Sequence, residues 1–114
     1  MLKVSSNKQA INISGSASEI AALARAIKKS KHGTVKEIGT DQGTIELICN
    51  GMKVEISCKH DKVAIQYSEA SKNELYSLIS MPSDTTVGSV FSIRPMDHEQ
   101  LFGLGSMGLE LIVE

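Results

Sequence analysis

TIELICNGMKVEISCKHDKVAIQY, residues 44–67, is the stretch that decides the fold. It contains three runs in which apolar and polar residues alternate, as they do in half-buried strands. The predicted strands cover Thr44–Cys49, Met52–Cys58 and Val63–Tyr67. Asn50-Gly51 joins the first two with the sequence typical of a type I′ hairpin turn, whose two central positions need positive φ. The stretch therefore predicts a three-stranded antiparallel meander.

The predicted turns place the large apolar residues of this meander on one face. A two-residue loop pairs Leu47 with Val54. A four-residue loop to the third strand pairs Ile56 with Ile65. A shift of one residue would turn every side chain to the other face, so pattern and turn chemistry agree on this register. We expect the helices to pack on the face formed by Ile45, Leu47, Val54, Ile56 and Ile65.

A first helix is predicted after Gly15. Ser16 precedes Glu19 by three residues, which is a capping box in which each side chain satisfies a free amide of the first turn. One apolar stripe at helical spacing follows, made of Ile20, Leu23, Ala24 and Ile27. Lysines in the last turn suit the helix dipole, and Gly33 is expected as a left-handed C-cap.

A second, shorter helix is predicted after the meander. Ser71 and Glu74 repeat the capping-box spacing, with Leu75, Leu78 and Ile79 on the inward side. Pro82 is expected to end this helix, because proline cannot continue the hydrogen-bond ladder.

The remaining runs complete the predicted architecture. An opening hairpin and three further strands are expected at Leu2–Val4, Ala10–Ile13, Thr34–Ile38, Val87–Ile93 and Gly108–Val113. The order, roughly ββαβββαββ, describes one α+β domain over residues 1–114, with two helices on one face of a mainly antiparallel sheet. The connection from Arg94 to Met107 is long, which is typical of a functional loop.

Composition excludes several classes of protein. The chain has 114 residues, 41% hydrophobic, which is too apolar for a disordered segment, and its net charge of −1 gives no overall affinity for polyanions. No stretch resembles a signal peptide or a membrane span, and two cysteines are too few for a disulfide scaffold, so we expect a cytoplasmic protein. Cys49 and Cys58 lie at opposite ends of the predicted hairpin, about 20 Å apart, and are expected to stay unbridged.

Catalytic and cofactor chemistry finds little support in the sequence. His32, His60 and His98 are far apart, and only His98, between Asp97 and Glu99, has acidic neighbours that tune a general base. There is no Cys-x-x-Cys pair for zinc, and Gly103-Leu104-Gly105 precedes a strand, whereas a phosphate-binding loop follows one. We expect no metal, no cofactor and no catalysis, with a small enzyme centred on His98 as an alternative.

Charge is unevenly distributed along the chain. Residues 1–33 carry six basic side chains and one acidic one, a net charge of +5, whereas residues 84–114 carry a net charge of −4. The lysines at the end of the first helix suggest a nucleic-acid-binding module as one alternative, although no aromatic side chain accompanies them to stack on bases. These lysines are Lys28, Lys29 and Lys31. The acidic stretch suggests a basic protein partner.

Two segments of the chain resemble small bacterial immunity proteins. These are GSASEIAALA at Gly15–Ala24, after a short strand, and SMGLELIV at Ser106–Val113, after a loop. The resemblance is to immunity proteins encoded beside polymorphic or contact-dependent growth inhibition toxins, and it covers about a quarter of the chain. It implies a cytoplasmic, non-catalytic domain that binds and neutralises a cognate toxin domain, often a nuclease with a basic cleft.

A partner of this kind would meet the acidic end of the chain. The residues expected to contact the toxin domain are Asp84, Asp97, Glu99, Phe102 and Glu110. The acidic residues would supply electrostatic complementarity, and Phe102 and Leu104 are candidate apolar anchors. Neither nucleic acid nor a membrane is expected as a partner under this interpretation.

Overall fold

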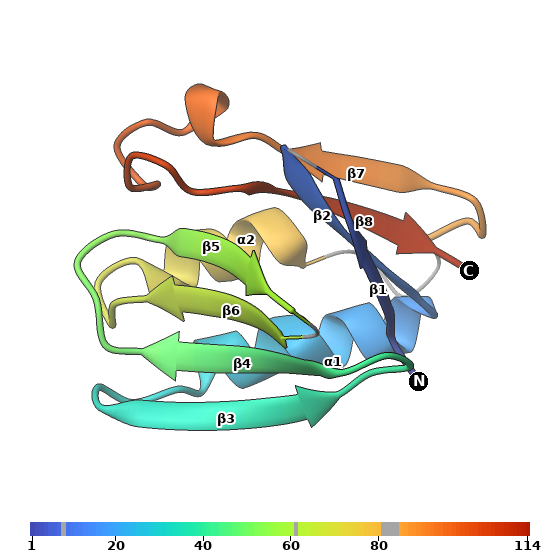
Figure 1. Cartoon of the computed structure of the whole chain (residues 1–114), viewed down its shortest axis with the longest axis horizontal. Coiled ribbons are helices and arrows are strands. Elements are labelled where there is room, and N and C mark those ends of the chain that lie inside the picture. Colours follow the sequence, from blue (N-terminus) through green and yellow to red (C-terminus); the bar gives the residue numbers. More distant parts are fainter. Residues whose placement is uncertain (8, 61, 81–84) are drawn as a thin grey trace.

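The alternating runs form two four-stranded sheets. The computed structural model describes residues 1–7, 9–60, 62–80 and 85–114. Sheet A contains, in spatial order, β1 (Lys3–Ser6), β2 (Ala10–Gly15), β8 (Gly108–Val113) and β7 (Val90–Ile93). Sheet B contains β3 (Thr34–Gly39), β4 (Thr44–Cys49), β6 (Lys62–Tyr67) and β5 (Glu55–Lys59) (Figure 1). In each sheet the two central strands are parallel and both outer pairs are antiparallel.

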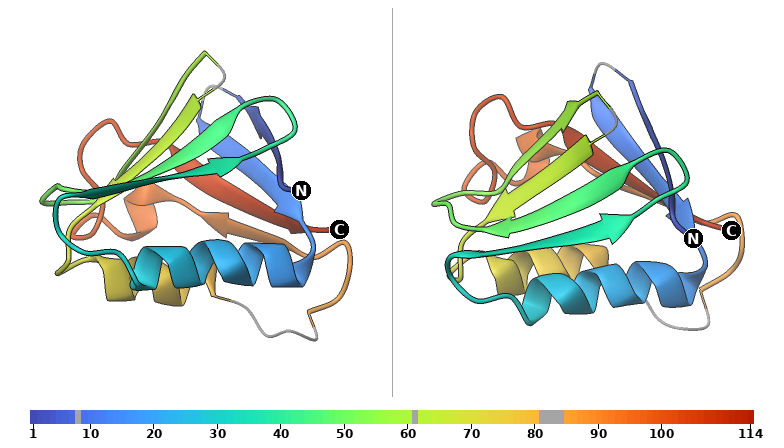
Figure 2. Two further views of the ribbon diagram at one scale, coloured as in Figure 1. Left: turned by 90° about the horizontal axis from the view of Figure 1, so that it is seen from below. Right: turned by 60° about the horizontal axis from the view of Figure 1, so that its bottom comes forward.

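Two helices close one side of the space between the sheets. They are α1 (Ala17–Lys28) and α2 (Lys72–Ile79), and a short 3₁₀ helix, η1 (Pro95–Asp97), follows β7. The helices pack against each other and lie side by side, with both sheets on one side of them (Figure 2). The predicted α+β class and the approximate order of elements are confirmed, but the single sheet is replaced by two.

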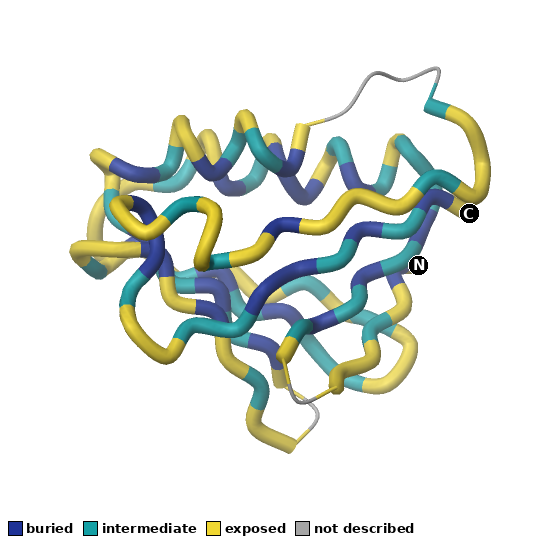
Figure 3. The backbone as a smooth tube through the Cα atoms, turned by 90° about the horizontal axis from the view of Figure 1, so that it is seen from above, coloured by how far each residue is buried: buried dark blue, intermediate teal, exposed yellow. Residues whose placement is uncertain are grey.

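One hydrophobic core fills the space between the sheets and the helices. Buried positions alternate with less buried ones along β2, β4 and β6, and Figure 3 shows the buried positions along the chain. The five residues predicted to share the inward face of the meander are all buried to within 1% exposure: Ile45, Leu47, Val54, Ile56 and Ile65. Cys49 is buried, Cys58 is half-buried and both are free thiols, as predicted.

The hairpin predicted at Asn50-Gly51 is wrong. β4 does not pair with β5, because β6 lies between them, parallel to β4 and antiparallel to β5. Neither Asn50 nor Gly51 has the positive φ that a type I′ turn needs. Positive φ occurs instead at His60, in the turn between β5 and β6. The predicted pairing of Ile56 with Ile65 across that turn is confirmed.

The central position of β6 agrees with the distribution of charge in sheet B. Between Val63 and Tyr67 this strand has no charged residue, which suits a central position where both edges are paired and both neighbours are close. β5 alternates its inward residues with Glu55, Ser57 and Lys59, which are exposed. Charged side chains on a strand are typical of a sheet edge. In sheet B the two strands with one charged residue each, β4 and β6, therefore take the centre, and the two strands with two charged residues each take the edges.

The chain consists of two halves with the same topology. Each half has the order ββαββ: β1, β2, α1, β3 and β4 form the first, and β5, β6, α2, β7 and β8 the second. The first hairpin of each half pairs with the second hairpin of the other half, so both sheets have equivalent orders. Gly33 and Gly88 occupy equivalent places before β3 and β7. Both have left-handed φ and donate their N–H to the last residue of the neighbouring strand, at 2.7 Å in each case.

The first predicted helix start is confirmed and the second is not. Ser16 Oγ accepts the N–H of Glu19 at 3.1 Å, and the Glu19 carboxylate accepts the N–H of Ser16 at 3.0 Å. Ser71 makes no capping bond to α2, because its hydroxyl is held by the backbone and hydroxyl of Ser68. Gly33 is left-handed as expected, but α1 ends at Lys28, so it belongs to the following turn.

Two further expectations concern the chain after α2. The strand expected from Val87 begins only at Val90, because Gly88 adopts a left-handed φ. Pro82 lies outside the described residues. No helix in the described parts of the chain is long and apolar enough to cross a membrane.

We expect the cap of α1 to contribute measurably to stability. Replacing Ser16→Ala removes the acceptor for the Glu19 amide and should lower the free energy of unfolding by about 1 kcal/mol, which is about 4 °C in Tm for a domain of this size. Ser16→Asp keeps an acceptor at the same place and should melt close to the wild type. Equal losses in both variants in a thermal melt would contradict the role of the cap.

Glu19 should also make the stability depend on pH. Hydrogen bonds from the Met1 amine, and then from the Ser16 amide, hold the pKa of Glu19 below its ordinary value. A carboxyl whose pKa is lower in the folded state stabilises the fold above its unfolded pKa of about 4.3, and this contribution disappears as pH falls through the folded value. Glu19→Gln should therefore be less stable than the wild type at pH 7, with the difference vanishing in acid. A difference that stays constant in denaturant titrations from pH 7 to pH 3 would contradict this.

Candidate functional site

The long connection between β7 and β8, residues 94–107, is fastened to the edge of β5 and to the residue before it. Val54 donates its N–H to Leu101 and accepts one from Gly103, at 2.9 Å each. Ile56 donates its N–H to Ser106 Oγ, and its carbonyl accepts the N–H of Met107, again at 2.9 Å. The connection therefore continues sheet B beyond β5 and covers that edge.

The equivalent connection in the first half of the chain is much shorter. Residues 40–43 join β3 to β4 and cover β1 in the same way: Asp41 donates its N–H to Leu2, and its carboxylate accepts the N–H of Val4 at 3.2 Å. Four residues are thus enough to cover an edge. The additional residues of the 94–107 connection form η1 and a raised wall beside sheet A.

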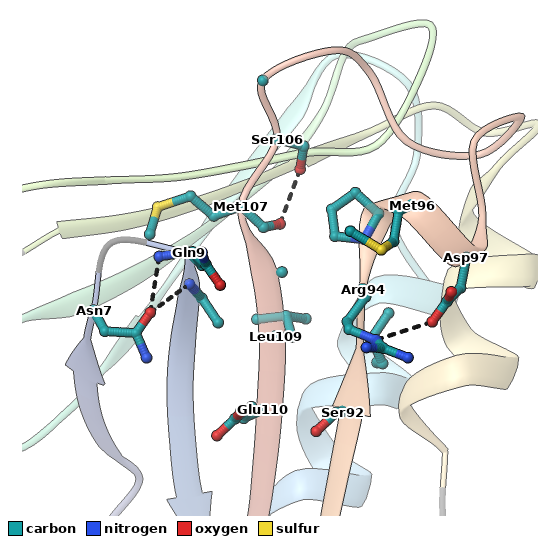
Figure 4. Close-up of a pocket in the computed structure, with 15 residues that line it drawn as sticks. Asn7, Gln9, Ser92, Arg94, Met96, Asp97, Ser106, Met107, Leu109 and Glu110 are labelled. Carbon is teal, nitrogen blue, oxygen red and sulfur yellow. Dashed lines mark hydrogen bonds and ion pairs between the residues drawn. The ribbon is translucent and has the colours of Figure 1, made fainter.

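An open groove of about 870 Å³ lies between this wall and the outer face of sheet A. Two small residues, Ala10 and Gly108, are neighbours in the β2–β8 pair and form part of its floor. Pro95 and Met96 line one side. On the other side the Asn7 carboxamide accepts the N–H groups of Gln9 and Ala10 at 2.8 Å each, which fixes the β1–β2 turn (Figure 4).

Charged groups of both signs line the groove. Arg94 Nε donates to the Asp97 carboxylate at 3.1 Å within the wall, so that these two charges offset each other. Glu110 projects from the outer face of β8, opposite Ser92 of β7 (Figure 4). Glu110 has no ion-pair partner in the parts of the chain that the structure describes. It is therefore the uncompensated charge of the groove.

The structure brings together only some of the residues predicted to bind a partner. Asp97 and Glu110 both line the groove. Glu99 is exposed two residues after Asp97, and its carbonyl accepts a bond from Lys53 Nζ at 3.4 Å. Phe102 is 3% exposed and packs in the core, so it is not available as a surface anchor. Asp84 lies outside the described residues.

Two exposed apolar side chains beside the groove can serve as the surface anchors that Phe102 was predicted to provide. Leu104 is fully exposed and Met96 is 71% exposed, both on the 94–107 connection. Sequence reasoning missed the contributions of Asn7, Gln9 and Arg94, because the β2–β8 pair brings the first turn of the chain beside the last connection. The signals for this surface in the sequence were the length of that connection and the acidic charge of residues 84–114.

The other candidate residues of the sequence are His98, which contacts a core ring, and the exposed lysines at the end of α1. The ring of His98 lies 6.3 Å from that of Phe102, centroid to centroid, and packs over the core. No group of three or more His, Cys, Asp or Glu side chains placed to hold a metal occurs among the described residues. Lys28, Lys29 and Lys31 are exposed at the end of α1, where Lys28 Nζ lies 4.7 Å from the centre of the Tyr76 ring.

A partly buried polar cluster joins the two helices. The Tyr67 hydroxyl is 2.6 Å from Ser30 Oγ, and Lys72 Nζ donates to the Ser30 carbonyl at 2.6 Å. Burial raises the pKa of Tyr67 and that of the neighbouring thiol of Cys49. These groups hold the end of α1 against the start of α2, so we assign them a structural role rather than a binding one.

No family model, curated protein or solved structure matches the chain. Any indication of function therefore has to come from the surface of the molecule itself.

We expect Ser106 to hold the wall of the groove in place. Ser106→Ala leaves the buried N–H of Ile56 without its acceptor and should lower the free energy of unfolding by about 1–2 kcal/mol, with faster amide exchange at Ile56 and Met107. Ser92→Ala, on the exposed outer face, should change stability by no more than about 0.5 kcal/mol. Unchanged exchange at Ile56 in the Ser106 variant would show that the hydrogen bond does not fix this segment.

Proposed function

We propose that the chain is a cytoplasmic immunity protein that binds a cognate bacterial toxin domain and neutralises it by direct contact. The observation that supports this most is the enlarged 94–107 connection. It combines exposed apolar side chains, Leu104 and Met96, with exposed carboxylates at Asp97 and Glu99, beside a groove that holds Glu110. An apolar centre with a charged rim is the usual composition of a protein interface.

The charge of this surface favours a basic partner. Arg94 is the only basic residue between positions 84 and 114, against five acidic ones, and it is already paired with Asp97. Nucleases that cut nucleic acid have basic clefts, which an acidic surface can cover. Complementary charges of this kind accelerate association more than they tighten the final complex.

A nucleic-acid-binding module is the second candidate. The exposed lysines 28, 29 and 31 at the end of α1 support it, since they form a local cluster of positive charge. Against it, the Tyr76 ring that Lys28 contacts is half-buried. A half-buried ring is a poor platform for stacking on bases, which provides much of the affinity for single strands.

Removing the acidic charges should weaken toxin binding through the on-rate. The variant Asp97→Asn, Glu99→Gln, Glu110→Gln, measured against the toxin domain encoded by the adjacent gene, should associate about tenfold more slowly at low salt. The difference should shrink at higher ionic strength, since the Debye length falls to about 8 Å at 0.15 M. Surface charges contribute little to stability, so the melting temperature should stay close to that of the wild type.

Charge reversal at Lys28, Lys29 and Lys31 is the matched control for this experiment. It should leave toxin binding intact under the immunity proposal. Tight binding to random RNA or DNA that this reversal abolishes, together with no affinity for the neighbouring gene product, would reject the immunity proposal in favour of the nucleic-acid module.

A further inference from the structure

Strand β7 is an edge of sheet A that is uncharged and that no connection in the described parts of the chain covers. Of the four edge strands in the described parts of the chain, β1 and β5 are covered by the 40–43 and 94–107 connections. The third, β3, carries Lys36 and Glu37. β7 has neither protection: from Thr85 to Ile93 the chain contains no charged residue, and Val90 and Phe91 are 55% and 39% exposed. Figure 3 shows the exposed trace of this segment.

The hydrogen-bonding groups of β7 are oriented to receive another strand. Ser89 accepts the N–H of Val113, so its carbonyl points toward β8. Because these directions alternate in an antiparallel pair, the N–H and C=O groups of Val90 and Ser92 point away from β8. No hydrogen bond to these groups is found in the described parts of the chain. An exposed, uncharged edge of this kind is a template for strand addition.

The outer face of sheet A beside β7 indicates which side chains an added strand would carry. Ser5, Asn12, Glu110 and Ser92 form one row across the four strands of sheet A. The carboxylate of Glu110 and the buried Oδ1 of Asn12 are neighbouring acceptors in this row, and Asn12 Oδ1 has no hydrogen-bond partner among the residues that the structure describes. Ser92 is short, and one strand spacing is about 4.8 Å. A basic side chain on an added strand can therefore lie over Ser92 and reach Glu110.

We propose that β7 binds an extended segment of a basic partner protein as a fifth strand of sheet A. The segment carries an arginine or lysine at the position facing Ser92 and apolar residues facing Val90 and Phe91. This inference rests on the proposed function, because that function is what makes the partner a protein. A second copy of this chain fits less well, because residues 84–114 carry a net charge of −4 and self-pairing brings like charges together.

The chain contains its own matched control. Val35 on β3 occupies the place equivalent to Val90 on β7 and is 58% exposed, against 55% for Val90. A lysine at either position puts a charge on an exposed edge, and both variants should melt within a few degrees of the wild type. Val90→Lys should weaken binding of the toxin domain at least tenfold, whereas Val35→Lys should leave it within twofold. Equal effects in the two variants would overturn the assignment of the edge.

A peptide probe tests the edge without the toxin. The probe is an eight-residue peptide of valine and threonine with one central arginine, and its counterpart has glutamate in place of arginine. In amide exchange followed by NMR, the arginine peptide should protect the N–H groups of Val90 and Ser92 and bind about fivefold tighter than the glutamate peptide. Glu110→Gln should abolish that preference. Equal protection of Val35 and Glu37 on β3 would contradict the proposal.

These measurements separate the two proposals. Protection of β7 by the arginine peptide, with no binding of the toxin domain, supports the edge and rejects the immunity function. Tight toxin binding that leaves the amides of Val90 and Ser92 unprotected supports the function and overturns the edge. A dimer in sedimentation that Val90→Lys dissociates would show that a second copy occupies β7, and would overturn the proposed partner.

Discussion

The two parallel strand pairs, β2–β8 and β4–β6, are the contacts on which the rest of the structure depends. Each joins a hairpin of the first ββαββ half to a hairpin of the second, so neither half can complete a sheet alone. The β2–β8 pair also connects opposite ends of the chain. Ordering such distant segments costs chain entropy before the apolar faces are buried, which makes assembly of the core cooperative. The helices then cover a space that exists only once both sheets are present.

This arrangement explains which parts of the fold the sequence could predict. A period of two determines the face to which a strand turns its apolar residues but not the strand beside it, so Ile45, Leu47 and Ile65 are buried whichever neighbour β4 takes. The Ser16–Glu19 cap depends on residues three apart and was predictable for that reason. The same spacing at Ser71 predicted a cap that does not form, since Ser68 supplies a competing local partner for the Ser71 hydroxyl.

The candidate site was less predictable, because pairing across the whole chain assembles it. Asn7 and Gln9 reach the wall formed by Arg94 and Pro95 only through the β2–β8 pair, and no local pattern indicates this. Phe102 and Leu104 are two residues apart in one loop, yet one is 3% exposed and the other fully exposed. The difference arises because the main chain at Phe102 lies beside Val54 in a parallel bridge, which turns its ring inward. That contact cannot be read from the loop itself.

Because the two halves of the chain are equivalent, comparing β3 with β7 shows which features the fold requires and which it does not. β3 and β7 have the same place in their sheets, the same glycine hydrogen bond before them and the same pairing with a central strand. The fold therefore imposes the same requirements on both edges. Their sequences nevertheless differ in charge, Lys36 and Glu37 on one and none on the other, and the 94–107 connection is extended only beside β7. Topology alone does not account for these differences, and the proposed binding of a partner strand at β7 explains why this edge lacks charge.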